Sequence, residues 1–434
     1  MGRAPTLTIV NAHDTVTHRL DLLPMWPGLR ALEAVPTLAH ALDGKVSLLP
    51  VPADDPARTE LLARTQRAGD PIDADVAIVA CTSGSTGTPK GAMLTAANLR
   101  ASIDATHSRL GGPGQWLLAT PPSHIAGLQV LLRTLRAGEV PVAMELSDGF
   151  RPSSLADAIG AMSGRRRYTS IVPLQLGRIL DDAGATAALA SLDGVLVGGQ
   201  ATSPELLRRA RAAGVTVLTS YGSSETSGGI AYDGIPLDGA RVTAEDDSGR
   251  IVISGPMVSR GYRNVDSPDL RPHPGRPFSE GPVGMFRTSD AGGVTTNDAG
   301  ETEVAVFGRI DDVIISGGLK FLPGPIEDAL TSLDGVADAA VVGVPDAELG
   351  RAVVAAVTLA DGTGAGTVDP RADATAGDAA AADHIRARLT PLLGKHQVPR
   401  AVFVVKQLPT LPSGKLDRTG LAATLAARWG MMSE

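Results

Sequence analysis

Short apolar runs rich in β-branched residues alternate with helical segments through the first half of the chain. Such runs predict buried strands, and each is followed by a loop and then by a helix. Strands that alternate with helices predict parallel βαβ units, in which ligands bind at the carboxyl ends of the strands. We therefore predict an α/β fold here, with strands at 75–81, 116–119, 194–199 and 215–220, and helices at 53–68, 124–137, 203–213 and from 173 to 180.

The pattern changes further along the chain. After residue 235 it becomes rich in short strands, at 250–254, 283–287 and 302–307. From Asp311 onward it predicts a separate small α+β unit, so we expect domains at 1–310 and 311–434. Residues 360–382 lack periodicity and indicate a flexible insertion loop. The remaining predicted elements are helices at 325–332 and 383–393 and strands at 336–344, 352–359 and 401–405.

The composition excludes several classes of protein. Of the 434 residues, 43% are apolar and 20% are charged, which is ordinary for a soluble globular chain. The net charge is −8 and the densest basic run is Arg165–Arg167, which we expect at a solvated helix end or turn, so no nucleic-acid partner is predicted. Cys81 has no internal disulfide partner, and we find neither a signal peptide nor a membrane-spanning run. We expect a cytoplasmic enzyme without stable membrane insertion.

The most informative segment is a loop rich in glycine and hydroxyl residues at 82–91, directly after the predicted strand at 75–81. Its N–H groups and hydroxyls form a nest for anionic oxygen, and Lys90 adds a positive charge. It is not a Walker A motif, because Pro89 precedes the lysine and Gly91 follows it. A solvated linker does not usually follow a buried strand. The loop therefore predicts phosphate binding by Thr82, Ser83, Gly84, Ser85, Thr86, Gly87, Thr88 and Lys90.

Later segments carry residues suited to nucleotide chemistry. Glu225 follows a predicted strand among hydroxyl groups, where it suits Mg²⁺ beside phosphate oxygens, although alone it fits an acid at a helix start equally well. Asp290 suits hydrogen bonds from ribose hydroxyls, but in isolation it fits a turn aspartate better. Segment 308–312 has the composition of a charged linker. Lys415 lies on a glycine turn and, taken alone, fits an exposed lysine.

In this order, the segments resemble those of the acyl-adenylate-forming superfamily, which includes acyl- and aryl-CoA synthetases, luciferases and the adenylation domains of peptide synthetases. The resemblance spans residues 76–420, most of the chain. One such motif can occur by chance, whereas seven in series are a strong signal. They are 82–91, 121–127, 221–226, 249–263, 286–290, 308–330 and 408–420.

The resemblance implies a large domain and a mobile small domain, with ATP and the substrate between them. It implies that a carboxylate and Mg-ATP give an acyl-AMP and pyrophosphate, and that a thiol, usually coenzyme A, then displaces AMP. Carried over by position, Thr82–Lys90 hold the β- and γ-phosphates, Ser224 touches the α-phosphate and Glu225 is the Mg²⁺ ligand. The other implied roles are adenine binding by Gly199, Gln200, Ala201, Tyr221 and Gly222, ribose binding by Asp290 and Arg309, a hinge at Asp311, a catalytic Lys415 that bridges the substrate carboxylate and the α-phosphate, and a pantetheine passage lined by Ser316, Gly317 and Gly318.

The chain departs from the usual pattern at two places. Ser289 stands where the superfamily commonly has glycine, and the phosphate loop comes early, so we expect a shortened front of the large domain. Short members with such a front resemble the o-succinylbenzoate–CoA ligases, which activate the aliphatic carboxylate of a keto-acid side chain on a ring that carries a second carboxylate. Candidate donors to the second carboxylate are Ser123, His124, Gln175 and Arg178, and His124 also counts among the catalytic candidates.

Several alternatives stay open. The chain could instead be another aryl- or acyl-CoA ligase, or a stand-alone adenylation enzyme that loads a carrier protein. Alternative structural roles for the donors are a capping or packed imidazole for His124 and a surface helix arginine for Arg178. A homodimer is also left open. The presence of Lys90, Glu225, Asp290, Arg309 and Lys415 argues against a catalytically silent member.

Overall fold

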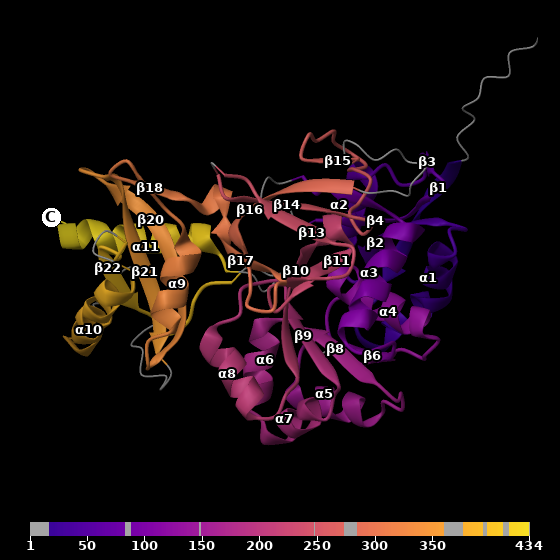
Figure 1. The fold of residues 1–434 in the computed structure, drawn as a ribbon, viewed down its shortest axis with the longest axis horizontal. Coiled ribbons are helices and arrows are strands. Elements are labelled where there is room, and N and C mark those ends of the chain that lie inside the picture. Colours follow the sequence, from indigo (N-terminus) through magenta and orange to yellow (C-terminus); the bar gives the residue numbers. More distant parts are fainter. Residues whose placement is uncertain are drawn as a thin grey trace, which may run out of the picture.

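The computed structural model describes residues 17–82, 88–146, 149–246, 248–272, 284–359, 376–393, 397–410 and 416–433. Within these ranges the strands form five sheets. Three belong to the part of the chain before residue 310, and the last part of the chain, orange to yellow in Figure 1, carries the other two. The described helices include none that is long and apolar enough to cross a membrane.

The first sheet contains the strand that leads into the glycine loop. Its order is β3-β1-β2-β4-β5, with β1, β2 and β4 parallel and β3 and β5 antiparallel to their neighbours. The strands are β1 (Thr17–Met25), β2 (Ser47–Pro52), β3 (Pro71–Asp73), β4 (Val76–Cys81) and β5 (Gly91–Thr95), and the helical segments are η1 (Gly28–Ala34), α1 (Val35–Leu42) and α2 (Pro56–Thr65). The predicted strand at 75–81 and helix at 53–68 are confirmed as β4 and α2.

The second sheet is the parallel sheet expected from the alternating pattern. Within the described residues its order is β12-β11-β10-β9-β8-β6-β7, and the pairs from β7 to β10 are parallel. The strands are β6 (Gln115–Leu118), β7 (Val142–Ala143), β8 (Arg167–Ile171), β9 (Gly194–Gly198), β10 (Val217–Ser223), β11 (Gly228–Tyr232) and β12 (Ile235–Pro236). The helical segments are α3 (Ala96–Arg109), α4 (Ile125–Ala137), α5 (Pro152–Gly160), α6 (Pro173–Leu180), α7 (Ala183–Ala190), α8 (Pro204–Ala212) and η2 (Ser224–Thr226).

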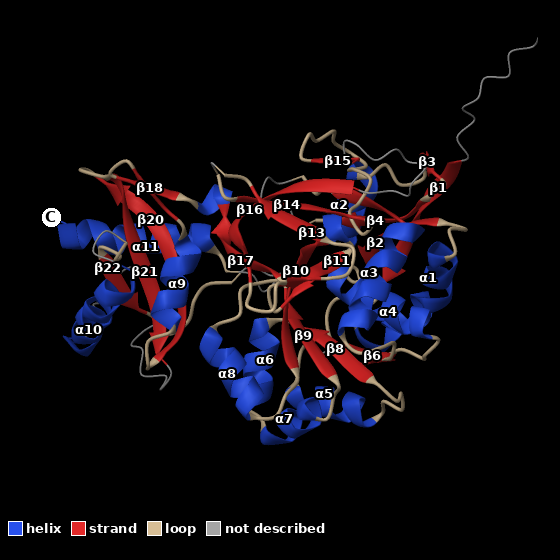
Figure 2. Ribbon diagram, in the orientation of Figure 1, coloured by secondary structure: helices blue, strands red, loops and turns tan. Residues whose placement is uncertain are grey.

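Helices cover both faces of this sheet (Figure 2). Leu196 of β9 belongs to the core that contains α3 and α4, whereas its neighbours Val195 and Val197 belong to the core that contains α5 to α8. This alternation is the period of two that a strand imposes on its side chains. Two of the helices begin at side-chain N-caps, since Thr95 accepts a hydrogen bond from the Asn98 N–H and Ser203 accepts one from the Leu206 N–H.

The third sheet is antiparallel and follows the second in the chain. Its strands are β13 (Arg241–Ala244), β14 (Arg250–Gly255), β15 (Leu270–Pro272), β16 (Gly284–Thr296) and β17 (Thr302–Arg309). They lie in the order β13-β14-β16-β15, with β17 also paired to β16. The β-rich region predicted after residue 235 is therefore confirmed, although β16 extends well beyond the expected strand.

The last part of the chain is α+β, as predicted. It contains η4 (Ile310–Asp312), β18 (Ile314–Ser316), β19 (Leu319–Phe321), α9 (Pro323–Thr331), β20 (Val336–Asp346), β21 (Gly350–Leu359), α10 (Ala376–Leu393), β22 (Ala401–Val404) and α11 (Arg418–Ser433). The order β20-β21-β22 forms a sheet with α9 and α10 in the core on one face and α11 in the core on the other. Gly317 and Gly318, both at positive φ, make the two-residue turn of the β18–β19 hairpin.

Two sequence-based predictions need correction. Residues 376–382, expected in a flexible loop at 360–382, begin helix α10, because an alanine-rich stretch favours helix; residues 360–375 lie outside the described ranges. Arg167, expected at a helix end or turn, begins strand β8, where its guanidinium donates to the Ser191 carbonyl and its N–H to the Asp193 carboxylate.

Candidate active site

The predicted site residues of the large sheet follow its parallel strands at their carboxyl ends. Ser123 and His124 come after β6, Gln175 lies on α6 after β8, and Gly199–Ala201 follow β9. Tyr221 lies near the end of β10, and Glu225 lies in the turn η2 that follows it. Because parallel strands end at the same edge of a sheet, these residues gather where an α/β sheet binds ligands.

Asp290 connects this edge to the third sheet. The Tyr221 hydroxyl donates to Asp290 Oδ2 at 2.8 Å, and an Arg309 guanidinium nitrogen lies 3.7 Å from Oδ1. Burial, followed by the charge of Asp290, raises the pKa of Tyr221, which therefore remains a donor. The Asp290 side chain is 24% exposed and a carboxylate has more lone pairs than these contacts use, so it can also accept hydrogen bonds from ligand hydroxyls.

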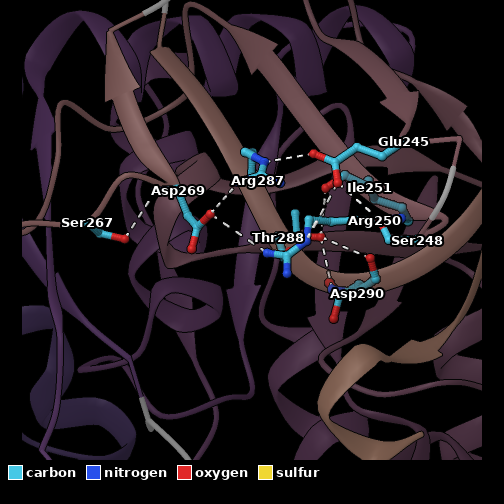
Figure 3. Close-up of polar contacts among 9 residues, drawn as sticks. All are labelled: Glu245, Ser248, Arg250, Ile251, Ser267, Asp269, Arg287, Thr288 and Asp290. Atoms are coloured by element: carbon cyan, nitrogen blue, oxygen red, sulfur yellow. Dashed lines mark hydrogen bonds and ion pairs between the residues drawn. The ribbon is translucent and has the colours of Figure 1, made fainter.

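Asp290 owes its position to an irregular stretch of β16 (Figure 3). The register between β14 and β16 shifts between Arg250 and Val252, which displaces Thr288–Asp290 from regular pairing. The buried Thr288 hydroxyl replaces the lost pairing, because it donates to the Ile251 carbonyl at 2.9 Å and accepts from the Asp290 N–H at 3.0 Å. Arg250 adds a hydrogen bond to the Thr288 carbonyl at 3.2 Å.

Four charged side chains form a network beside this stretch (Figure 3). Arg287 lies between Glu245 at 2.7 Å and Asp269 at 3.2 Å. Arg250 lies 4.0 Å from Glu245 and 3.8 Å from Asp269, so the signs alternate. All four side chains are between a quarter and two fifths exposed, and such pairs contribute modestly to stability. The network links Arg287 of β16 to Arg250 of β14 and to the segments after β13 and before β15, next to the Thr288–Asp290 stretch.

Glu225 lies in a tight turn, and the end of β10 that leads into this turn requires glycine at position 222. The Thr226 hydroxyl accepts from the Ser223 N–H and donates to the Gly228 carbonyl. A Cβ on Gly222 would lie 2.1 Å from the Gly228 carbonyl oxygen. Glu225 is 7% exposed, and its Oε1 accepts a hydrogen bond from the Tyr262 hydroxyl at 2.7 Å.

Lys90 lies over the ring of the same tyrosine. Its Nζ lies 5.3 Å from the centroid of the Tyr262 ring, within the range of a cation–π contact. The adjacent Pro89 carbonyl accepts from Gln66 Nε2 at 2.9 Å and from Asn264 Nδ2 at 2.8 Å, and the Lys90 carbonyl accepts from the Thr82 N–H at 2.9 Å. The end of the glycine loop is thus fixed beside the Glu225 turn. Ser83, Gly84, Ser85, Thr86 and Gly87 lie outside the described residues.

Comparison with known proteins identifies the family. Residues 12–263 match the AMP-binding enzyme family, and residues 325–415 match the AMP-binding enzyme C-terminal domain. The chain belongs to the AMP-binding enzyme family. This agrees with the resemblance to the acyl-adenylate-forming enzymes found in the sequence.

Individual relatives agree with the family. A protein of Mycobacterium tuberculosis named probable 2-succinylbenzoate–CoA ligase is 46% identical over 371 residues, covering 86% of this chain and 90% of the relative. A feruloyl-CoA synthase of Amycolatopsis is 31% identical, covering 79% and 68%. The structure of o-succinylbenzoate coenzyme A synthetase from Bacillus subtilis with ATP and magnesium covers 93% of this chain and 90% of its own, with a TM-score of 0.69 and 22% identity, a likeness of fold.

The residues expected near the acid substrate differ in their contacts and exposure in this AMP-binding enzyme. Gln175 accepts from the Val172 N–H and donates to the Ala119 carbonyl, so it ties the start of α6 to the end of β6. His124 occupies the N-cap position of α4, and its side chain is exposed. Ser123 is half-buried and Arg178 is exposed on α6. Gln175 is thus placed to shape the 119–124 loop.

The structure describes some, but not all, of the functional residues expected in the C-terminal part of the chain. Asp311, the expected hinge, accepts from the Arg309 guanidinium at 3.0 Å. Gly317 and Gly318 form the hairpin turn, and the Gly317 N–H donates to the Leu349 carbonyl. Lys415 lies outside the described residues, but Thr410 pairs with Leu416 directly after it.

The sequence analysis did not single out several residues that organise the site, namely Gln66, Tyr262, Asn264 and Thr288. A signal for Tyr262 was available, because the chain has only 4 tyrosines and this one stands inside the motif at 249–263. Gln66 carried no comparable signal, since it lies far from the glycine loop in the sequence.

The donor set fits a nucleotide-bound magnesium ion. Mg²⁺ is commonly held by one or two carboxylates, with waters and substrate phosphates completing its shell. Glu225 presents one buried carboxylate whose Oε1 accepts from Tyr262, and within the described part of the chain Oε2 can serve a metal. The described residues contain no cluster of three or more His, Cys, Asp or Glu side chains able to enclose an ion, so a metal here would rely on phosphate oxygens.

Proposed function

We propose that this chain is an AMP-forming acid–CoA ligase that converts 2-succinylbenzoate to 2-succinylbenzoyl-CoA, a step of menaquinone (vitamin K2) biosynthesis. The observation that carries the substrate is the 46% identity to the mycobacterial 2-succinylbenzoate–CoA ligase relative, over 86% of this chain. The site geometry is compatible with the first half-reaction, in which the carboxylate and Mg-ATP give an acyl-AMP and pyrophosphate.

The nucleotide assignment uses the two tyrosine–carboxylate pairs. Asp290 and Arg309 hold the ribose, and Tyr221 with Gly222 and Gly199–Ala201 flank the adenine. Lys90 and Thr82–Thr88 hold the β- and γ-phosphates, Ser224 contacts the α-phosphate, and Glu225 is the magnesium ligand. When bound, the ion neutralises charge on the phosphates, which repel the incoming carboxylate.

The second assignment concerns the small domain. The buried apolar residues up to 304 form cores that contain no residue from 314 onward, and the later residues form cores of their own. This separation supports domains at 1–310 and 311–434. Lys415 stabilises the charge that develops between the substrate carboxylate and the α-phosphate. Because thioester formation has no use for that lysine, rotation about Asp311 removes it and brings the Ser316–Gly318 face to coenzyme A.

The aromatic acid then binds at the carboxyl ends of β6 and β8. Ser123, His124 and Arg178 are the proposed donors to its second carboxylate, with Gln175 shaping the 119–124 loop. The enzyme acts in the cytoplasm, since its single cysteine suits a reducing compartment. We also propose a homodimer, which light scattering of the purified protein tests directly.

A panel of acids tests the substrate. Purified protein is given ATP, Mg²⁺ and coenzyme A with 2-succinylbenzoate, ferulate, benzoate or a fatty acid, and AMP and the CoA thioester are measured. We expect turnover with 2-succinylbenzoate and at most about a hundredth of that kcat/KM with the others. Turnover with ferulate, as the feruloyl-CoA synthase relative at 31% identity suggests, and none with 2-succinylbenzoate would overturn the substrate in favour of another aryl-CoA ligase. Pyrophosphate exchange without transfer to coenzyme A would instead favour loading of a carrier protein.

The role of Lys415 has its own test. Lys415→Ala should reduce acyl-AMP formation by about a thousandfold, a magnitude typical for loss of a group that stabilises developing charge. Thioester formation from supplied acyl-AMP should remain within a few-fold of the wild type. Equal loss in both half-reactions would contradict a lysine that acts in the first alone.

A further inference from the structure

The segment 259–264 touches both parts of the proposed phosphate site. The Ser259 N–H donates to the Glu225 carbonyl at 2.7 Å, and the Arg263 N–H donates to the Gly91 carbonyl at 2.8 Å. Tyr262 pairs with Ala92 of β5 in an antiparallel bridge. The segment thus joins the end of the glycine loop to the turn that carries Glu225.

Tyr262 is the residue of this segment whose side chain reaches Glu225. Its hydroxyl donates to Oε1 at 2.7 Å, and its ring packs against the apolar cores of the first two sheets and of the third. The face of the same ring lies 5.3 Å from the Lys90 ammonium. One side chain therefore contacts both charged groups assigned to Mg-ATP.

We propose that Tyr262 is a positioning residue for the metal site: its hydroxyl occupies Glu225 Oε1 and turns Oε2 toward the ion. This rests on the proposed function, in which Glu225 is the magnesium ligand. The ring is partly buried and packs against two apolar cores, so it cannot follow the carboxylate, and the hydrogen bond fixes the carboxylate rotamer before the ion arrives. Hydrogen-bond partners of metal-binding carboxylates typically change metal affinity by 10- to 100-fold when they are removed.

Metal binding can be measured apart from turnover. Mn²⁺ is titrated into protein saturated with a non-hydrolysable ATP analogue, and the bound ion is followed by electron paramagnetic resonance. Tyr262→Phe removes the hydroxyl and keeps the ring for its apolar contacts and for Lys90. We expect the Mn²⁺ dissociation constant to rise about tenfold. The midpoint of urea unfolding of the metal-free variant should stay close to the wild-type value.

Tyr168→Phe is the matched control. The Tyr168 hydroxyl donates to the carbonyls of Leu110 and Gly112 at 3.0 Å, so its loss also removes tyrosine hydrogen bonds, but away from the site. Wild-type Mn²⁺ binding is expected for this control. Equal weakening in both variants would reflect general loosening and would overturn the positioning role.

Glu225→Gln separates this proposal from the proposed function. If Glu225→Gln weakens Mn²⁺ binding and Tyr262→Phe stays within twofold of the wild type, the positioning role is wrong and the metal assignment stands. If Glu225→Gln binds Mn²⁺ like the wild type, the metal assignment itself fails, and the role of Tyr262 fails with it.

Discussion

Replacement of Thr288 by valine would test whether the irregular stretch of β16 positions Asp290. Valine has nearly the shape of threonine, so no cavity forms and only the hydroxyl is lost. That hydroxyl donates to the buried Ile251 carbonyl and accepts from the Asp290 N–H, and Thr288 is 2% exposed. A buried group left without its partner costs about 1–3 kcal/mol. We expect Thr288→Val to lower the free energy of unfolding by about 2–4 kcal/mol.

The same change should weaken the nucleotide site. Without the hydroxyl, the Asp290 N–H is no longer held, and the carboxylate shifts relative to Tyr221 and Arg309. Loss of about 1.4 kcal/mol of ribose binding corresponds to about a tenfold rise in the KM for ATP. Urea unfolding and pyrophosphate exchange measure the two effects. Thr288→Ser keeps the hydroxyl and should restore most of both. The reasoning is refuted if Thr288→Val unfolds within about 0.5 kcal/mol of the wild type with an unchanged KM for ATP.

Three further changes test other parts of the structure. Burial, followed by the charge of Arg133, lowers the pKa of His107 from 6.5 to about 4, so the unfolded state takes up its proton first as the pH falls. The wild type should lose about 3 kcal/mol between pH 6.5 and 4 that His107→Gln does not lose, and a pH-independent gap between their urea unfolding free energies would contradict this. Gly222→Ala places a Cβ 2.1 Å from the Gly228 carbonyl oxygen, so calorimetry with an ATP analogue should show binding at least tenfold weaker, and wild-type affinity would disprove the clash. Glu327→Gln removes the carboxylate that Arg418 holds through two hydrogen bonds, leaving the Asp312 carboxylate at 3.5 Å, and should cost about 2–3 kcal/mol, with faster hydrogen exchange in α11; unchanged exchange there would show that the ion pair does not hold the helix.

The central α/β sheet was predictable because its strands are short and buried. Val195–Val197 give a continuous apolar run whose alternate residues enter different cores, and Gly198 and Gly199 mark the turn that follows. The flanking strands gave weaker patterns. Proline interrupts both β1 and β2, so their alternation of apolar residues is not distinct. Strand β5 begins at Gly91 immediately after the loop, so its start is not distinct either. The C-terminal helix α11 was missed as well.

The contacts of the site were less predictable than its residues. Tyr221 and Glu225 share one motif, but Tyr221 meets Asp290, 69 residues away, and Glu225 meets Tyr262, 37 residues away. Which carboxylate each tyrosine meets depends on strand register. Asp290 pairs with Arg309 only because β16 and β17 align with an irregularity just after Ala291. A change of register by one residue would turn the aspartate to the other face, and no local pattern in the sequence sets it.

The two tyrosine–carboxylate bonds run in opposite directions along the chain, and this explains how the site is held. Tyr221 reaches from the second sheet to Asp290 of the third, whereas Tyr262, from the connection after β14, reaches back to Glu225 beyond the end of β10. The carboxylates proposed to bind the ribose and the metal therefore each accept a hydrogen bond from a tyrosine in another part of the fold. Both bonds depend on how the two sheets lie against each other. A ligand that contacts both Asp290 and Glu225 should then stabilise this arrangement more than a ligand that contacts either alone, because it also links the second sheet to the third.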